Sequence, residues 1–118
     1  MNHEDLKEKI EAIIPMIRAF FEARGFEGIE ESIDSLTGLP KISTLASDYD
    51  YQMSLTPKLY MNSAEECELL FLKPSVGDTY YRQRSITLTL KGGSWKFEYD
   101  GREYVLTPQV LEAIYDAE

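Results

Sequence analysis

The chain has 118 residues, of which 43% are hydrophobic and 28% charged, proportions that fit one globular domain over residues 1–118 and argue against wholesale disorder. Its formal net charge of −9 argues against direct binding to a nucleic-acid backbone, which depends on Lys and Arg. The same charge favours partners that are basic.

The first predicted element is a long amphipathic helix from Glu4 to Arg24. Apolar residues recur along this segment at spacings of three and four, which places them on one face. Arg24 and Gly25 are typical of a helix end. Pro15 removes one backbone hydrogen bond and clashes with the preceding turn, at roughly 3 kcal/mol, so we expect a kink there.

The segment that follows predicts a short second helix, because Ile29, Ile33 and Leu36 are four and three residues apart. Leu39-Pro40 would end this helix, and residues 41–47 would form a connection or a short strand.

A strand is expected next. Its apolar positions alternate with polar ones and it stops before Pro57. The alternating apolar residues are Tyr49, Tyr51, Met53 and Leu55.

Residues 64–72 support two interpretations. Ser63 to Glu66 resembles a capping box and predicts a helix. The apolar run Cys67–Leu72 also fits a buried strand, and periodicity does not separate the two over so short a run. We favour the strand.

Three alternating runs between Ser85 and Leu106 predict an antiparallel meander. Gly92-Gly93 and Asp100-Gly101 fit the two-residue hairpin turns that join them. Counting outward from both turns places one apolar set on one face, and a slip of one residue would scatter this set. This set is Ile86, Leu88, Leu90, Trp95, Phe97, Tyr99, Tyr104 and Leu106. The opposed pairs it implies are Leu90 with Trp95, Leu88 with Phe97, Ile86 with Tyr99, Phe97 with Tyr104, Trp95 with Leu106, and the like-charged Glu98 with Glu103.

A short helix is expected at the end of the chain, because Thr107-Pro108 combines a helix cap with Pro at the first helical position. The sum predicts an α+β domain: an antiparallel meander of about four or five strands, with a kinked N-terminal helix and a short C-terminal helix on one face.

Few residues in this chain suggest catalysis. His3 is the only histidine and lies near the terminus, and Cys67, without a histidine partner, is interpreted as a small buried hydrophobe. One cysteine and one histidine cannot supply the three or four nitrogen or sulfur ligands of a zinc site, and Asp48 and Asp50 alone are too few for a hard cation. We therefore expect no metal, no cofactor and no enzyme.

The location of the protein is predicted from what its sequence lacks. There is no signal-peptide pattern at the start and no apolar run of membrane-spanning length. A single cysteine cannot form an intrachain disulfide, which suits a reducing compartment. We expect a cytoplasmic protein.

One basic cluster could hold an anion or a nucleotide, because arginines among tyrosines bind carboxylate or phosphate groups and stack on planar ones. Its members are Tyr80, Arg82, Arg84, Tyr99 and Arg102. The alternative is that these arginines pair internally with the acid-rich first 36 residues.

The function expected from these observations is that of a small acidic, non-enzymatic interaction protein: an inhibitor, immunity protein, adaptor or assembly factor that binds a basic protein surface. Its carboxylate-rich face would include Glu27, Glu30, Glu31, Asp34, Asp48 and Asp50. A small-ligand or nucleotide site at the arginine–tyrosine cluster is the alternative function. A homodimer through an open sheet edge is compatible with the first hypothesis.

Overall fold

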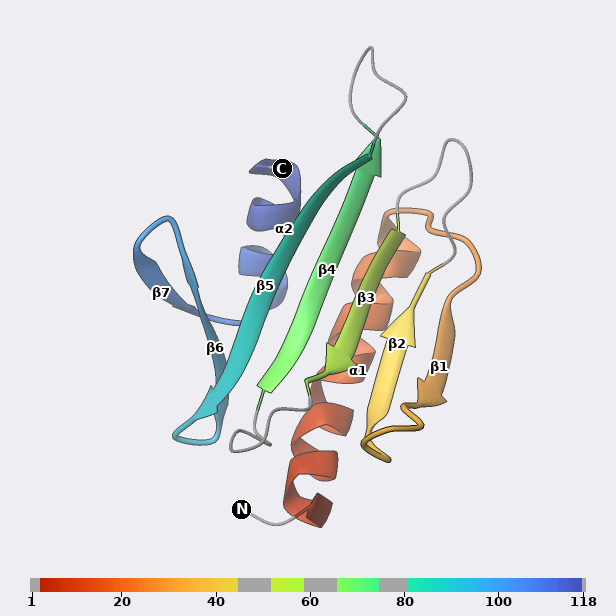
Figure 1. The fold of residues 1–118 in the computed structure, drawn as a ribbon. Helices are drawn as coiled ribbons and strands as arrows, with labels where there is room; N and C mark the ends of the chain where they lie inside the picture. Colours follow the sequence, from red (N-terminus) through yellow and green to blue (C-terminus); the bar gives the residue numbers. More distant parts are fainter. Residues whose placement is uncertain (1–2, 45–51, 59–65, 75–80, 118) are drawn as a thin grey trace.

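The computed structural model describes residues 3–44, 52–58, 66–74 and 81–117. Within these residues a helix is followed by seven strands and a second helix (Figure 1). The helices are α1 (His3–Ala23) and α2 (Pro108–Ala117). The strands are β1 (Glu30–Ile33), β2 (Pro40–Ser43), β3 (Gln52–Pro57), β4 (Glu66–Pro74), β5 (Tyr81–Lys91), β6 (Ser94–Tyr99) and β7 (Arg102–Val105).

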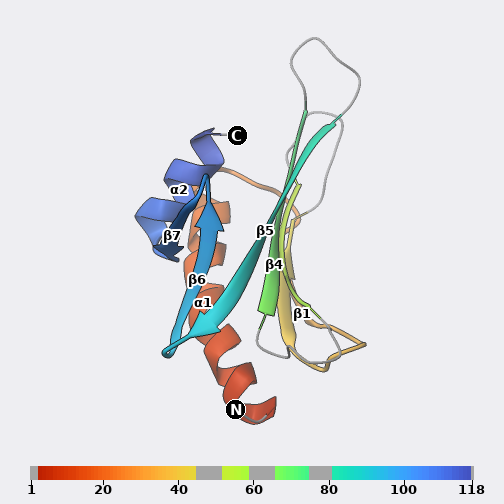
Figure 2. The same cartoon turned by 60° about the vertical axis from the view of Figure 1, so that its left-hand side comes forward.

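The strands form one antiparallel sheet, and their order across the sheet is their order in the sequence. Each strand therefore pairs with the next one along the chain, as expected of a meander. Both helices lie on the same face of the sheet, and no described helix lies on the other face (Figure 2). The α+β architecture is as predicted, although the described sheet has seven strands rather than four or five.

Helix α1 forms where the apolar periodicity predicted it and continues through Pro15. Its buried stripe packs on the sheet and consists of Leu6, Ile10, Ile14, Ile17, Phe20 and Phe21. The helix ends in a Schellman motif: the amide of Phe26 donates to Phe21 O, the amide of Gly25 donates to Glu22 O, and Gly25 has a φ of 73°. The rings of Phe21 and Phe26 meet at 5.6 Å, which is the apolar contact typical of this motif.

The β5–β6–β7 meander confirms the predicted turns. Leu90 lies opposite Trp95, Phe97 lies opposite Tyr104, and the amide of Leu106 donates to Trp95 O at 2.9 Å. Trp95 is buried, and its Nε1 donates to the carbonyl of Lys9 in α1 at 3.0 Å. The first helix therefore covers the apolar face of the meander, as predicted.

Two predicted pairings of this meander are not among those formed, those of Leu88 with Phe97 and of Ile86 with Tyr99. In the described residues β5 pairs with β6 only from Thr89 to Lys91, and then the two strands separate (Figure 2). The physical reason is curvature: β6 and β7 turn toward the helices, whereas β5 stays paired with β4. The side chains of Ile86 and Phe97 nevertheless remain buried.

The predicted second helix over residues 29–36 is wrong. This segment forms β1 and a tight turn that leads into β2. The Asp34 carboxylate accepts hydrogen bonds from the Thr37 amide at 3.0 Å and from its hydroxyl at 2.8 Å. The Asp34 carbonyl accepts from the amide of Gly38, whose φ is 71°. This local turn chemistry prevails over the helical spacing of the isoleucines.

From Glu66 onward, the segment for which both a helix and a strand were considered is a strand, which is the interpretation that we favoured. β4 begins at Glu66 and buries Cys67 and Leu69. The strand expected before Pro57 is β3, with Met53 and Leu55 buried. The proposed cap at Ser63, and the beginning of the predicted strand at Tyr49 and Tyr51, lie outside the described residues.

Helix α2 begins as predicted, because the hydroxyl of Thr107 accepts from the amide of Val110 at 3.1 Å. Leu111, Ile114 and Tyr115 are buried against the rest of the core. The ring of Tyr115 meets that of Phe20 edge to face at 5.3 Å, which packs α2 against the C-terminal part of α1.

Candidate functional site

A groove lies between α1 and the first two strands. It has a volume of about 370 Å³. Its apolar lining comes from Ile14 and Pro15 of α1, Ile33 of β1 and Pro40 of β2. Its polar lining is Glu11, Glu31, Ser32 and Lys41. We call this hollow the α1–β1 groove.

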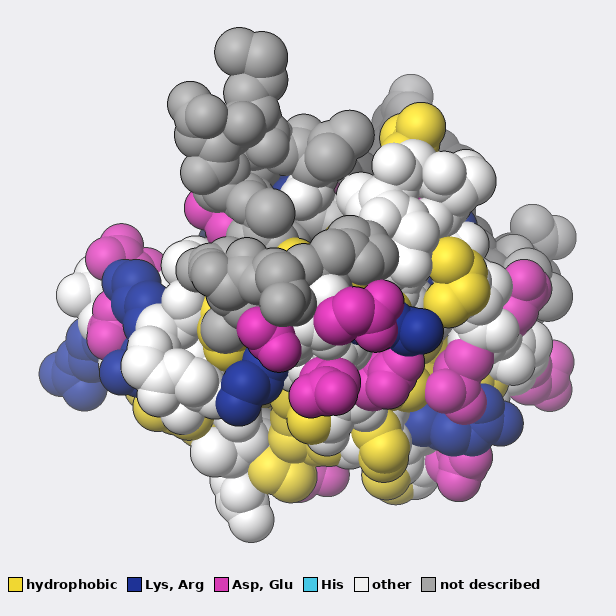
Figure 3. Space-filling model, turned by 90° about the horizontal axis from the view of Figure 1, so that it is seen from below, with side chains coloured by type: hydrophobic (Ala, Val, Ile, Leu, Met, Phe, Trp, Pro, Cys, Tyr) yellow, Lys and Arg dark blue, Asp and Glu magenta, His cyan; other side chains and the backbone are white. Residues whose placement is uncertain are grey.

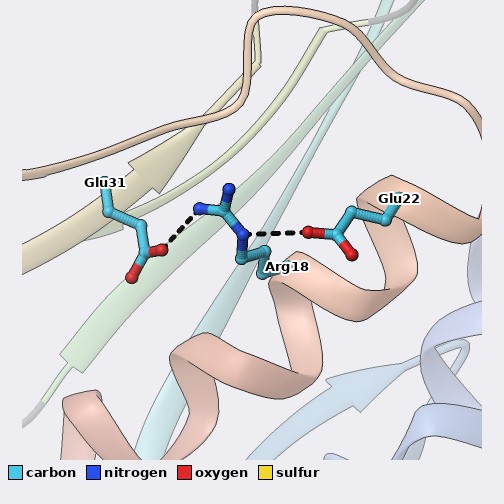
Figure 4. A network of polar contacts seen from close by, with 3 residues as sticks. All are labelled: Arg18, Glu22 and Glu31. Carbon is cyan, nitrogen blue, oxygen red and sulfur yellow. Dashed lines mark hydrogen bonds and ion pairs between the residues drawn. The ribbon is translucent and has the colours of Figure 1, made fainter.

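Arg18 connects the helix and the first strand that form the groove. Arg18 of α1 reaches Glu31 of β1 at 2.5 Å from Nη1 to Oε2, and its Nε donates to Glu22 at 2.9 Å (Figure 4). The hydrogen bond to Glu31, followed by that to Glu22, raises the pKa of the Arg18 guanidinium above its ordinary value. The side chains are partly exposed, so the contact adds little to the stability of the fold.

Two large apolar side chains are exposed close to the groove. Ile33 is 57% exposed and belongs to its lining, and Leu36, in the turn that follows, is 80% exposed. Single exposed apolar residues are common, but two of them near an apolar hollow form a small exposed hydrophobic patch. Neighbouring apolar and acidic surface of this kind suits a partner that carries both apolar and basic side chains.

Acidic side chains dominate the beginning of α1. Glu4, Asp5, Glu8 and Glu11 are all exposed. Seen from the end of the molecule at which α1 starts, acidic side chains gather across the middle of the surface, with hydrophobic ones beside them (Figure 3). The lining of the α1–β1 groove itself holds two carboxylates, Glu11 and Glu31, and one cation, Lys41.

The structure describes four of the six predicted partner-binding carboxylates. Glu27 and Glu30 are exposed before and at the start of β1. Glu31 binds Arg18, and Asp34 holds the turn through Thr37. Asp48 and Asp50 lie outside the described residues. In segment 27–34, Glu27 and Glu30 are therefore exposed carboxylates, whereas Glu31 and Asp34 make contacts within the fold.

The predicted arginine–tyrosine cluster is described in part. Arg84 places its guanidinium carbon 4.9 Å from the centre of the Tyr99 ring, and Arg102 lies opposite Tyr99 in the β6–β7 pairing. Tyr80 and the side chain of Arg82 lie outside what the structure describes. Because Arg84 covers one face of Tyr99, that face is not open to stack on a planar ligand.

Two arginines outside the predicted cluster form ion pairs with carboxylates. Arg18 pairs with Glu22 and Glu31, and Arg24 contacts Asp116 at 2.8 Å. These contacts link α1 to β1 and to α2.

The burial of Cys67 fits its interpretation as a small hydrophobic residue of the core. Cys67 is buried, and this burial raises the pKa of its thiol to about 12, so the thiolate is disfavoured. In residues 3–44, 52–58, 66–74 and 81–117, no three His, Cys, Asp or Glu side chains are grouped so that they could hold a metal ion. None of the described helices is long and apolar enough to cross a membrane.

Sequence reasoning missed the apolar part of the candidate site. The helix expected over residues 29–36 would place Ile33 on one face with Ile29 and Leu36, whereas in β1 Ile33 is exposed. The available signal was Asp34-Ser-Leu-Thr-Gly38, a polar, glycine-ended stretch typical of a hairpin loop.

Comparisons with protein families, with curated proteins and with solved structures give no significant match for this chain.

Proposed function

We propose that the chain is a small, acidic, non-enzymatic interaction protein, such as an inhibitor, immunity protein, adaptor or assembly factor. The α1–β1 groove carries this proposal: an apolar hollow lies next to the exposed Ile33 and is lined at its edge by Glu11 and Glu31. The partner is a protein segment that presents apolar side chains among Lys or Arg.

Charge and shape contribute different parts of the binding. A net charge of −9 attracts a basic partner and speeds its approach, but such attraction alone is not specific. The groove supplies specificity, because an apolar side chain that enters it is removed from water against Ile14 and Pro40.

This function is preferred to the small-ligand alternative. The contact of Arg84 with Tyr99 uses the aromatic face on which a planar ligand would stack. The α1–β1 groove, by contrast, combines exposed apolar surface with a lining in which carboxylates outnumber cations.

The first experiment titrates the full chain with an amphipathic peptide of about twelve residues, leucine on one face and lysine on the other. Ile33→Ser should weaken binding roughly tenfold, because one apolar contact is lost from the lining of the groove. Val105→Ser is the matched control, since Val105 is 46% exposed on the opposite edge strand. Equal effects of the two substitutions would contradict the proposed surface.

The same titration at two salt concentrations tests whether electrostatic attraction contributes to the binding. Binding should weaken as salt is raised from 50 mM to 300 mM, by roughly tenfold, because carboxylate–lysine attraction is screened. A peptide with glutamate in place of lysine should not bind. An affinity that does not change with salt would argue against a basic partner.

A further inference from the structure

A second surface lies on the other side of the molecule, where β5 and β6 separate. β4 pairs with β5 from Tyr81 to Thr89, whereas the described pairing of β5 with β6 covers only Thr89 to Lys91. Among the described strands, none pairs with the edge of β5 before Thr89 on the β6 side (Figure 2). Protein chains rarely leave a long strand edge open without covering or blocking it.

The hairpin turn identifies which backbone groups point into this opening. Lys91 and Ser94 flank the two-residue turn and form a hydrogen-bonded pair, so Thr89 and Lys96 form the next one. By the same alternation, the N–H and C=O groups of Ser85 and Thr87 point toward β6, where β6 is no longer paired. On β6 the corresponding backbone groups are those of Glu98.

A polar hollow of about 360 Å³ occupies this opening. It is lined by both strands, including Ser85, Thr87 and Phe97. Its charged lining is Arg84, Lys91, Lys96, Glu98 and Glu103. This lining has three cations and two carboxylates, so its net charge is positive, whereas the net charge of the whole chain is −9. Lys91 and Glu103 contact each other at 3.0 Å.

We propose that this opening, the β5–β6 cleft, binds an extended peptide segment with acidic side chains, which adds to β5 as a further strand. The backbone of the peptide would bond to Ser85 and Thr87. Its side chains alternate between the two faces of the sheet and meet a cation on each. Arg84 lies on the face of Ile86 and Tyr99, and Lys96 lies on the face of Thr87 and Thr89.

A second copy of the chain fits this edge less well. A second copy added through its own β5 would bring a further Arg84 to an edge that already carries Arg84, and like charges on facing strands are destabilising. The acidic peptide therefore has the better charge complementarity.

The test follows backbone amides by NMR in the full chain. The probe is a peptide of about eight residues in which pairs of glutamates alternate with pairs of valines, so that glutamates lie on both faces of the added strand. It should shift the amide signals of Ser85 and Thr87 and slow their hydrogen exchange. A peptide with lysine in place of glutamate should bind roughly tenfold more weakly.

N-methylated peptides separate strand addition from simple charge attraction. Methyl groups on alternate amides block only one edge of an extended peptide. One of the two alternating methylation patterns should therefore abolish binding, while the other leaves it intact. Equal binding of both patterns would overturn strand addition.

Two substitutions repeat the test from the side of the protein. Ser85→Pro removes the amide that points into the cleft and should abolish binding, whereas Ser85→Ala keeps that amide and should bind normally. If the Ser85→Pro chain does not fold, the N-methylated peptides still test strand addition, because they are titrated into the original chain. Slow exchange of Ser85 and Thr87 in the chain alone would overturn the proposal. If the hydrogen-exchange protection of these two amides rises with protein concentration, a second copy of the chain binds in the cleft instead of a peptide.

Discussion

At the scale of single residues, Trp95 joins the two layers of the molecule. Its ring is buried among the apolar residues of the sheet, and its Nε1 donates to the carbonyl of Lys9 in α1. Large aromatic residues contribute much of the apolar area of a small core, and a satisfied ring nitrogen also fixes their orientation. Trp95 therefore sets where the first helix lies on the sheet.

Trp95→Phe should lower the free energy of unfolding by about 1–3 kcal/mol, through the lost hydrogen bond and the smaller ring. Urea unfolding followed by circular dichroism measures this loss. Tyr104→Phe is the control, because it keeps the ring that stacks on Phe97 at 5.8 Å. A Trp95→Phe chain as stable as the original would show that the indole does not hold α1 in place.

At the scale of elements, the sequence predicts those parts whose signals are local. The periodicity of α1, the glycine turns of the meander and the Thr107 cap all predict what the structure shows. The separation of β5 from β6 could not be predicted, because it depends on how the sheet curves over two helices that are distant in sequence. β1 was missed for a different reason, since a spacing of three and four residues is not unique to helices.

The turn between β1 and β2 makes a prediction that depends on pH. The hydrogen bond from Thr37 lowers the pKa of the Asp34 carboxyl below its ordinary value of 3.8. A carboxylate with a lowered pKa stabilises the folded state above its ordinary pKa, and this contribution is lost as the pH falls through the lowered value.

Asp34→Ala should therefore cost about 1 kcal/mol at neutral pH, and the difference from the original chain should shrink in acid. Urea unfolding at a series of pH values measures the difference. Asp34→Asn offers an amide oxygen in place of the carboxylate and does not titrate, so its difference from Asp34→Ala should stay constant. A gap between the original chain and Asp34→Ala that widens in acid would contradict this role.

At the scale of the whole molecule, two surfaces of opposite character lie at different parts of one sheet. The α1–β1 groove, beside the first strand, is largely apolar, and carboxylates outnumber cations in its lining. The β5–β6 cleft is polar, and cations outnumber carboxylates in its lining. A chain with both surfaces could hold a basic segment and an acidic segment at the same time, which is what an adaptor or assembly factor does.

The most direct measurement of the central claim is an amide NMR map of the full chain titrated with the leucine–lysine peptide. Binding in the α1–β1 groove predicts that the largest shifts fall on Glu11, Ile14, Glu31, Ile33 and Lys41, with little change in β6 and β7. Shifts spread evenly over the acidic surface, or concentrated at β6 and β7, would contradict it.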